Sequence, residues 1–144
     1  MSAQASALEA VAKYFFFSCL DEELAYSASL KVLSELSSRN LLDSAHRGYW
    51  IRTLHAWKGK LKSVKPKNWS PTGGRGYALP PGFDVAVWAS FLSASEAVES
   101  EAVLLSRILS FTDAEISFGL GVTEGTVRYR VGRGLRHLGG FLES

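Results

Sequence analysis

Residues 110–138 read SFTDAEISFGLGVTEGTVRYRVGRGLRHL, and this stretch decides the fold of the C-terminal part of the chain. Thr112 and Glu115 have the T-x-x-E spacing of a capping box, in which each side chain satisfies a backbone N–H at the start of a helix. Gly121 follows at a place where the chain must turn and a residue that tolerates positive φ is favoured. The spacing therefore predicts a short helix that begins after Thr112 and ends at Gly121.

A second, longer helix is predicted directly after this turn. Thr123 suits its N-cap position, because a threonine hydroxyl can accept from one of the unpaired N–H groups of the first turn. The apolar residues that follow recur at spacings of four, four and three, as on one face of a helix; they are Val127, Val131, Leu135 and Leu138. Two helices joined by a short turn that contains glycine form a helix-turn-helix.

The polar residues of this second helix favour contact with DNA. Residues 126–138 carry four arginines and no acidic residue. A guanidinium group presents a planar fork of donors that suits phosphate oxygens and the acceptor edge of guanine. The first turn of such a helix enters the major groove, so its hydroxyl and carboxylate groups are candidate contacts as well. The predicted DNA-binding residues are Thr112, Thr123, Glu124, Thr126, Arg128, Tyr129, Arg130, Arg133 and Arg136.

This stretch resembles region 4 of the bacterial sigma-70 family, especially the small extracytoplasmic-function sigma factors. The resemblance rests on the core E-I-x-x-x-L-G-V-T-x-G-T-V-R, which occupies residues 115–128. LuxR-type response regulators and other helix-turn-helix families share part of this core. The resemblance implies a domain that binds promoter DNA, with core RNA polymerase as a candidate partner.

Three departures from the family pattern concern the turn and the second helix. Ser117 replaces a small alanine that packs against the turn, and Tyr129 stands where a small serine is usual. Gly132 and Gly134 fall inside the second helix, where each glycine costs up to about 1 kcal/mol relative to alanine. We therefore expect a second helix that is weaker, or that bends after its first two turns.

Length and composition indicate a small globular protein. The 144 residues suit one domain or two very small ones. Hydrophobic residues make up 47% of the sequence, which is enough to form a core. The net charge of +2 is too small to indicate a nucleic-acid partner by itself, but residues 46–75 carry eight Lys and Arg and no Asp or Glu. This segment therefore has a local positive field that favours a polyanion.

Cysteine usage and the N-terminal sequence favour a cytoplasmic protein. The single cysteine, Cys19, excludes an internal disulfide framework, and its apolar surroundings predict a buried, inert thiol. The N-terminal residues lack the basic segment of a signal peptide. The apolar run at residues 14–20 is too short to span a membrane, so no membrane association is expected.

Three helices are predicted in residues 1–64. The first spans about residues 5–20, and its three successive phenylalanines at 15–17 cover most of its circumference, so we expect it to lie between partners. Asp21 is a plausible N-cap for the second, at about residues 22–37. The third spans residues 47–64 and has a strong apolar stripe; it consists of Trp50, Leu54, Trp57, Leu61 and Val64.

The second and third of these helices also bear on function. The helix at 22–37 is similar in spacing to a region 2 helix of small sigma factors that docks on RNA polymerase, although Tyr26 and Ser27 replace the acidic pair of the family. The third helix carries basic residues around its apolar stripe, and we expect its tryptophans to pack in the core. A secondary basic contact is predicted at Arg52, Lys58, Lys60, Lys62 and Lys65.

Residues 65–83 contain all four prolines and several glycines, which predicts a linker. The helices expected after it span residues 84–93 and 94–110, as two helices or one broken one, with Ser93 and Glu96 as a capping box for the second. The sequence thus predicts an all-α protein with two small helical domains joined by a Pro/Gly-rich linker. Residues 1–64 resemble a divergent sigma region 2, and residues 84–144 form the helix-turn-helix domain that resembles region 4.

No enzyme activity, cofactor, metal site or small-molecule substrate is expected. The three histidines lie far apart, and neither a Walker motif nor a nucleophile elbow is present. Two functions stay open. The first is a sigma-like DNA-binding transcription factor that recognises promoters with core RNA polymerase as a candidate partner, or a stand-alone LuxR-like regulator. The second is a sigma-mimicking interaction module that binds a polymerase, an anti-sigma factor or a signalling protein without reading DNA.

Overall fold

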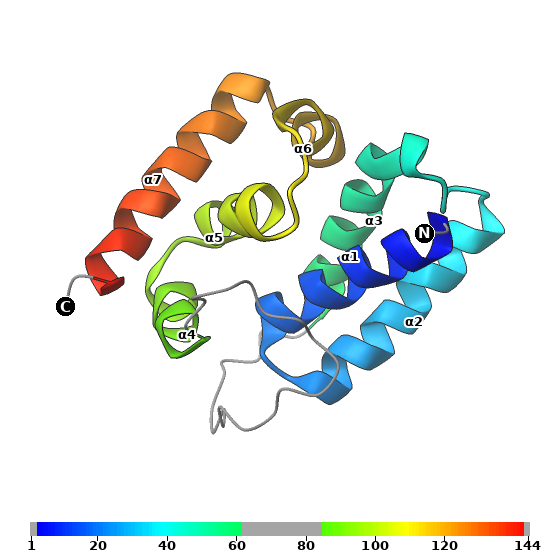
Figure 1. Cartoon of the computed structure of the whole chain (residues 1–144), viewed down its shortest axis with the longest axis horizontal. Coiled ribbons are helices and arrows are strands. Elements are labelled where there is room, and N and C mark those ends of the chain that lie inside the picture. Colours follow the sequence, from blue (N-terminus) through cyan, green and yellow to red (C-terminus); the bar gives the residue numbers. More distant parts are fainter. Residues whose placement is uncertain (1–2, 62–84, 143–144) are drawn as a thin grey trace.

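A computed structural model of the chain describes residues 3–61 and 85–142 (Figure 1). These residues form seven α-helices with no strand between them, which confirms the predicted all-α fold class. The predicted linker at 65–83, which includes Lys65, lies outside the described residues, as do Lys62 and Val64. The elements are α1 (Ala3–Cys19), α2 (Glu22–Ser38), the 3-10 turn η1 (Ser44–His46), α3 (Arg47–Lys60), α4 (Val85–Ala94), α5 (Ala97–Val103), the π turn η2 (Leu104–Ile108), α6 (Asp113–Leu120) and α7 (Glu124–Leu142).

The first two helices form an antiparallel pair (Figure 1). Asp21 caps α2 as predicted, because its Oδ1 accepts a hydrogen bond from the Leu24 N–H at 3.0 Å. The phenylalanines at 15–17 are all buried, in agreement with a helix that lies between partners. One of those partners is α4: the Trp88 Nε1 donates to the Phe17 carbonyl at 2.8 Å, and the two rings meet edge to face. The N-terminal helices are thus packed directly against a helix that follows the predicted linker.

A second contact of this kind joins α3 to α6. Gly48 and Gly119 lie where the two helices meet, and both lack the side chain that would keep the backbones apart. A Cβ added to Gly48 would lie 2.5 Å from the Phe118 ring, and one added to Gly119 would overlap the Ile51 side chain. The two glycines therefore allow a close approach between α3 and the first helix of the helix-turn-helix.

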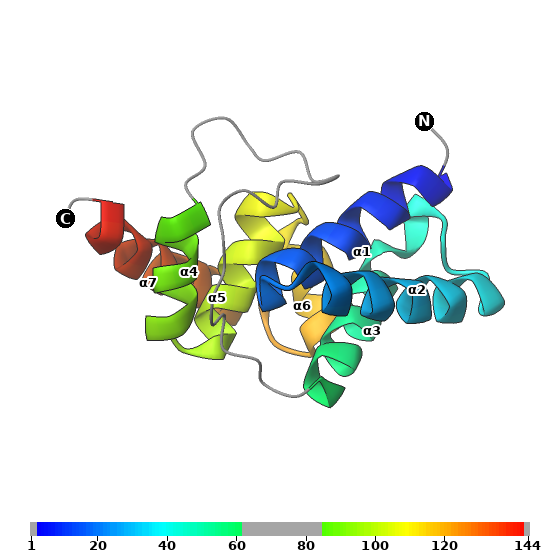
Figure 2. The same cartoon turned by 90° about the horizontal axis from the view of Figure 1, so that it is seen from below.

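The centre of the molecule is α5, which lies between the N-terminal helices and α7 (Figures 1 and 2). Two helices form in this region, as predicted, but the predicted capping box is wrong. Ser93 lies inside α4, which ends at Ala94, and Glu96 is itself the residue before α5 with no capping hydrogen bond from its side chain. The reason is that the Ser95 N–H donates to the Phe91 carbonyl and extends α4 beyond the expected turn.

Buried side chains from all seven helices form one continuous hydrophobic cluster. It includes residues of the N-terminal helices, such as Trp50, and residues of the helix-turn-helix, such as Ile116 and Val127. The separation of the chain into domains 1–64 and 84–144 stays a prediction. Among the described residues, no helix has the length and apolarity needed to cross a membrane.

Candidate nucleic-acid interface

The start of α6 has the predicted capping box. The Thr112 hydroxyl accepts from the Glu115 N–H at 3.1 Å, and the Glu115 carboxylate accepts from the Thr112 N–H at 2.9 Å. Gly121 ends the helix in the left-handed region with φ 70°, where glycine is favoured. The turn is also closed by Ser117, whose hydroxyl donates to the Val122 carbonyl. The serine that departs from the family pattern therefore has a structural partner in the turn.

The second helix, α7, runs without a break from Glu124 to Leu142. Gly132 and Gly134 both lie within this continuous helix, and the weakening or bend that they predict stays a prediction. Gly134 is needed where it stands: an added Cβ would lie 2.5 Å from Val103 Cγ2 and 3.1 Å from the Glu99 carbonyl oxygen. The glycine lets α7 approach α5 closely, and tertiary packing offsets its low helix propensity.

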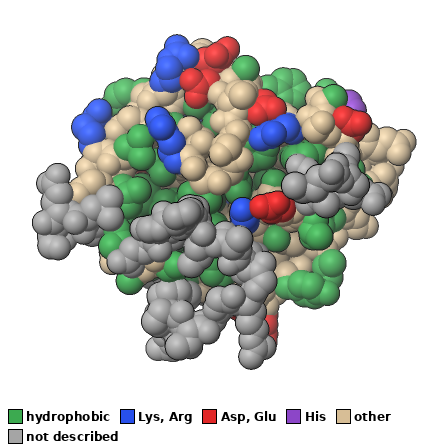
Figure 3. Space-filling model, viewed as in Figure 1, with side chains coloured by type: hydrophobic (Ala, Val, Ile, Leu, Met, Phe, Trp, Pro, Cys, Tyr) green, Lys and Arg blue, Asp and Glu red, His purple; other side chains and the backbone are tan. Residues whose placement is uncertain are grey.

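The face of α7 that points away from the core carries several of the predicted DNA-binding residues. Val127 and Val131 are buried on the inner face, as the apolar stripe predicts. Tyr129 is 60% exposed, and the other exposed members of the predicted set on or directly before α7 are Thr123, Glu124, Arg128 and Arg136. Figure 3 shows Lys and Arg side chains at the edge of the molecule that α7 forms, and cationic and acidic groups interspersed elsewhere on this face.

The two threonines at the start of α7, Thr123 and Thr126, are hydrogen-bond partners. Thr123 Oγ1 accepts from the Thr126 N–H at 3.1 Å, and the two hydroxyl oxygens lie 2.9 Å apart. Thr123 therefore has the N-cap role that the sequence predicts. Arg128, by contrast, has only a long ion pair with Asp113, at 3.8 Å between two exposed side chains. A pair of this kind contributes little, so the Arg128 guanidinium stays available for an external anion.

Arg133 differs from the other arginines because it contacts a buried carboxylate. Its Nε lies 2.6 Å from Oε2 of Glu99 on α5, whose side chain is 3% exposed. His137, one turn further along α7, places Nδ1 3.0 Å from the other oxygen of the same carboxylate. A buried carboxylate needs such partners, so Arg133 has an anchoring role in addition to any external contact. The sequence analysis did not single out Glu99, and its separation of 34 positions from Arg133 leaves no local signal for the pair.

A second buried carboxylate, Glu101, joins α5 to α1 and α3. It accepts from the Tyr14 hydroxyl at 2.6 Å, and His55 Nδ1 lies 2.8 Å from the same oxygen. Burial acts to raise the pKa of Glu101, but the hydrogen bond from His55 and the positive charge of Lys58 outweigh it, so the pKa is lowered. The hydrogen bond to Glu101 in turn raises the pKa of His55.

Arg130 of α7 is half-buried. Its charge, like that of Lys58 on α3, acts to lower the pKa of His55. Lys58, from the predicted secondary basic contact, and Arg130, from the predicted recognition helix, therefore both disfavour the charged form of His55.

The remaining basic residues of α3 fall into two groups. Arg52 contacts α6: its guanidinium donates to the Phe118 carbonyl at 3.3 Å and lies 4.5 Å from the centre of the Phe118 ring. Lys60 is exposed and stacks over Trp57 at 4.6 Å. Of the predicted secondary set, Arg52 is therefore used to hold the helix-turn-helix, while Lys58 and Lys60 remain near the surface.

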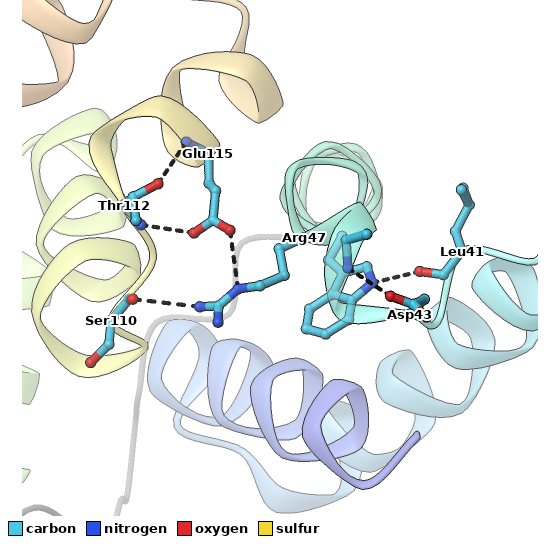
Figure 4. Close-up of polar contacts among 8 residues, drawn as sticks. Leu41, Asp43, Arg47, Ser110, Thr112 and Glu115 are labelled. Atoms are coloured by element: carbon cyan, nitrogen blue, oxygen red, sulfur yellow. Dashed lines mark hydrogen bonds and ion pairs between the residues drawn. The ribbon is translucent and has the colours of Figure 1, made fainter. Parts of the chain in front are cut away.

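Arg47, which the sequence did not single out, also holds the helix-turn-helix. Its guanidinium lies between the Ser110 carbonyl, at 3.4 Å, and the Glu115 carboxylate, at 3.3 Å (Figure 4). It also stacks over the Phe111 ring at 4.7 Å. The first residue of α3 thus binds the capping box of α6, so the start of the helix-turn-helix is linked to the N-terminal helices.

Residues 96–138 match the family model of sigma-70, region 4. The match covers α5, η2, α6 and most of α7, which together are less than a third of the 144-residue chain. Comparison with curated proteins and with solved structures gives no match. The resemblance to region 4 that the sequence predicted is confirmed, and these residues form a sigma-70 region 4 helix-turn-helix domain. The resemblance of the N-terminal helices to region 2 stays a prediction.

Proposed function

We propose that this protein, whose residues 96–138 carry sigma-70 region 4, is a sigma-like transcription factor that recognises promoter DNA through α7. The observation that carries the proposal is the position of exposed cationic groups on the outward face of a helix that the family match includes. Such a function places the protein in the cytoplasm, where it meets the chromosome. It requires no catalytic group or cofactor.

The roles of the residues follow from the geometry of helix-turn-helix docking. The N-terminal turn of α7 enters the major groove, where Glu124 can accept from the amino group of a cytosine. Arg128 and Arg136 can donate to guanine or to phosphate oxygens, since both are exposed. Thr112, at the start of α6, lies where the first helix crosses the backbone of the duplex. Lys58 and Lys60 can add phosphate contacts from α3.

Binding to randomised duplex DNA tests this proposal. The double variant Arg128→Ala/Arg136→Ala should lose most of its DNA affinity while its far-UV circular dichroism remains helical. The salt dependence should also become shallower, because each lost phosphate contact releases about one fewer counterion. Unchanged affinity would contradict the assignment of α7 as the recognition helix.

A matched control is available on α2, which lies far from α7 (Figure 1). Lys31→Ala/Arg39→Ala removes the same number of positive charges from exposed positions of α2 and its C-cap. Because these residues lie outside the proposed interface, this variant should keep its affinity apart from a small change due to net charge. An equal loss in both double variants would mean that binding depends only on net charge.

Core RNA polymerase is the proposed protein partner, and a sigma-mimicking interaction module is the second candidate function. The observation that favours a protein partner is the exposure of Tyr26 (65%) and Leu30 (51%), which lie one turn apart on α2. Large apolar side chains that remain exposed together are typical of interaction surfaces. An anti-sigma factor or a signalling protein would be alternative occupants.

Size-exclusion chromatography with core polymerase, with and without promoter DNA, separates these functions. Co-elution that Tyr26→Ser/Leu30→Ser abolishes would support polymerase binding through α2. Binding to DNA alone would favour a stand-alone helix-turn-helix regulator. Binding to polymerase without any contribution from DNA would favour the interaction module.

A further inference from the structure

A chain of polar contacts runs from the core to the outer surface of α7. It begins at the Glu99 carboxylate, which is buried on α5 and lies 2.6 Å from Arg133 Nε. The same guanidinium donates through Nη1 to the Tyr129 hydroxyl oxygen at 3.2 Å. Arg133 is four residues after Tyr129, so the two side chains lie along the same face of the helix. Arg133 therefore connects the Tyr129 phenol to the Glu99 carboxylate, whose position is fixed by its burial in the core.

This arrangement limits the positions that the Tyr129 ring can take. An exposed tyrosine normally samples several rotamers, and fixing it at a ligand costs side-chain entropy at the moment of binding. Here the planar guanidinium is held at one nitrogen by Glu99 and directs another nitrogen at the phenol oxygen. Part of that entropy cost is therefore met in the folded protein before any ligand arrives.

The residues one turn before and one turn after Tyr129 on α7 are glycines. Gly125 lies one turn before it and Gly132 one turn after it, and neither presents a side chain. An added Cβ would meet only Thr123 Oγ1 at 3.8 Å in the first case, and only Arg136 Nη1 at 3.7 Å in the second. The Tyr129 side chain, which is 60% exposed, thus projects from α7 between two positions that have no side chain. A flat object such as the edge of a base pair can approach it closely.

The chemistry of the exposed phenol suits one base in particular. Its oxygen already accepts a hydrogen bond from Arg133, so its own O–H is available to donate outward. The ring edge beside it is apolar. In the major groove, thymine places an acceptor, O4, next to a methyl group, and no other base presents this pair of features.

We infer that Tyr129 selects a thymine in the DNA site, and that Arg133 is a positioning residue that holds the ring for this contact from its anchor on Glu99. The inference rests on the proposed function, since it requires that α7 lies in the major groove. The two residues, both in the predicted DNA-binding set, thus have different roles: Tyr129 contacts the base, and Arg133 holds the Tyr129 ring in position.

The first experiment selects duplex sites from a randomised library with the full-length protein and with two variants. The wild-type sites should contain a position that is almost always thymine. Tyr129→Phe keeps the ring but loses the O–H, so its preference at that position should be weaker. Tyr129→Ala should lose the preference there and keep the preferences at the other positions.

The second experiment changes the DNA instead of the protein. Replacing that thymine by deoxyuridine removes only the methyl group, and loss of one buried methyl should weaken wild-type binding about fourfold. Tyr129→Ala should bind both DNAs equally. Equal binding of both DNAs by the wild type, or an unchanged fourfold difference in Tyr129→Ala, would overturn the inference.

The positioning role is tested with a conservative variant. Arg133→Lys keeps a positive charge beside Glu99 but lacks the planar fork of guanidinium donors, so it cannot hold the phenol in a fixed direction from the same anchor. It should therefore reduce the thymine preference while binding at the other positions is retained, which a residue that only stabilises the fold would not do. Arg136→Ala removes a charge from the same face of α7, and it should lower the affinity while the preference at the thymine position stays unchanged.

The outcomes distinguish this inference from the function on which it rests. A wild-type protein that enriches no sequence overturns both. A wild-type protein that enriches a site, in which Tyr129→Ala lowers affinity uniformly or not at all, overturns the role of Tyr129 and leaves the recognition helix in place. A loss confined to the thymine position supports the inference.

Discussion

Gly119 of α6 lies so close to Ile51 of α3 that a Cβ on the glycine would overlap the isoleucine side chain. The first residue belongs to the helix-turn-helix and the second to the N-terminal helices, with the predicted linker between them in sequence. The contact is supported by Arg47 and Arg52, whose guanidinium groups bind backbone carbonyls just before α6 and within it. The position of the helix-turn-helix relative to the N-terminal helices therefore depends on a glycine at one helix crossing.

We predict that Gly119→Ala destabilises the protein, because the extra methyl group forces α3 and α6 apart. Overpacking of this kind typically costs about 1–3 kcal/mol. The melting temperature measured by circular dichroism should fall by several degrees. Gly59→Ala is the matched control, since Gly59 is exposed in α3 and a Cβ there has no neighbour within 4 Å. That change should be neutral or slightly stabilising, and an equal loss in both variants would contradict the packing argument.

Gly132 and Gly134, which look alike in the sequence, should respond in opposite directions to substitution by alanine. Gly132→Ala should stabilise α7 by up to about 1 kcal/mol, because alanine has the higher helix propensity and the site has room. Gly134→Ala should destabilise the protein, because its methyl group would meet Val103 and the Glu99 backbone. Urea unfolding of the two variants measures the difference. A gain in stability from both would show that α7 is not held against α5 as described.

Tyr14→Phe should destabilise the protein by about 1–3 kcal/mol, since it removes a hydrogen bond to a buried charged group. The Tyr14 hydroxyl donates to Glu101 at 2.6 Å, and burial, together with the charge of Glu101, raises the pKa of Tyr14 well above its ordinary value. Tyr26→Phe on the exposed face of α2 is the control and should change the free energy of unfolding very little. A loss that is no larger in Tyr14→Phe than in the control would mean that Glu101 is satisfied without the phenol.

The His55–Glu101 pair should make stability depend on pH. The pKa of His55 is raised by folding, so its contribution is fully present below about pH 6.5 and is lost as the pH rises through the folded-state value. The pKa of Glu101 is lowered, so its contribution is present above about pH 4.5 and is lost as the pH falls through its folded-state value. The pair therefore contributes most between these limits.

Replacement of His55 by glutamine tests this pH dependence. The wild type should lose stability between pH 5.5 and pH 8.5, and His55→Gln should lose less over the same interval, because its side chain does not titrate. Urea unfolding at the two pH values measures both differences, and comparison within each protein removes the contribution of groups common to both. The same pH dependence in both proteins would assign it to other groups.

The local features of the helix-turn-helix were predictable because their signals lie within one or two helical turns. The capping box of Thr112 and Glu115, the left-handed Gly121 and the N-cap Thr123 each depend on neighbours no more than four residues away. The apolar stripe of α7 is equally local, and its buried valines lie where the periodicity places them. The capping box predicted for α5 was wrong because α4 continued beyond Ser93, and nothing local to that motif marks the end of the preceding helix.

The sequence by itself determined the two helices of the helix-turn-helix, their caps and the cationic outward face of α7, because propensity, capping and periodicity act between residues that are close in the chain. Only the tertiary structure decided which arginines bind partners within the protein and which remain available for an external anion. Arg133 is bound to Glu99, and Arg52 to the Phe118 carbonyl, across separations of 34 and 66 residues. These partners meet because α5 and α6 pack against α7 and α3 through glycines that leave room for a neighbouring helix. Such contacts depend on how whole helices cross, and no pattern within a single helix specifies that crossing.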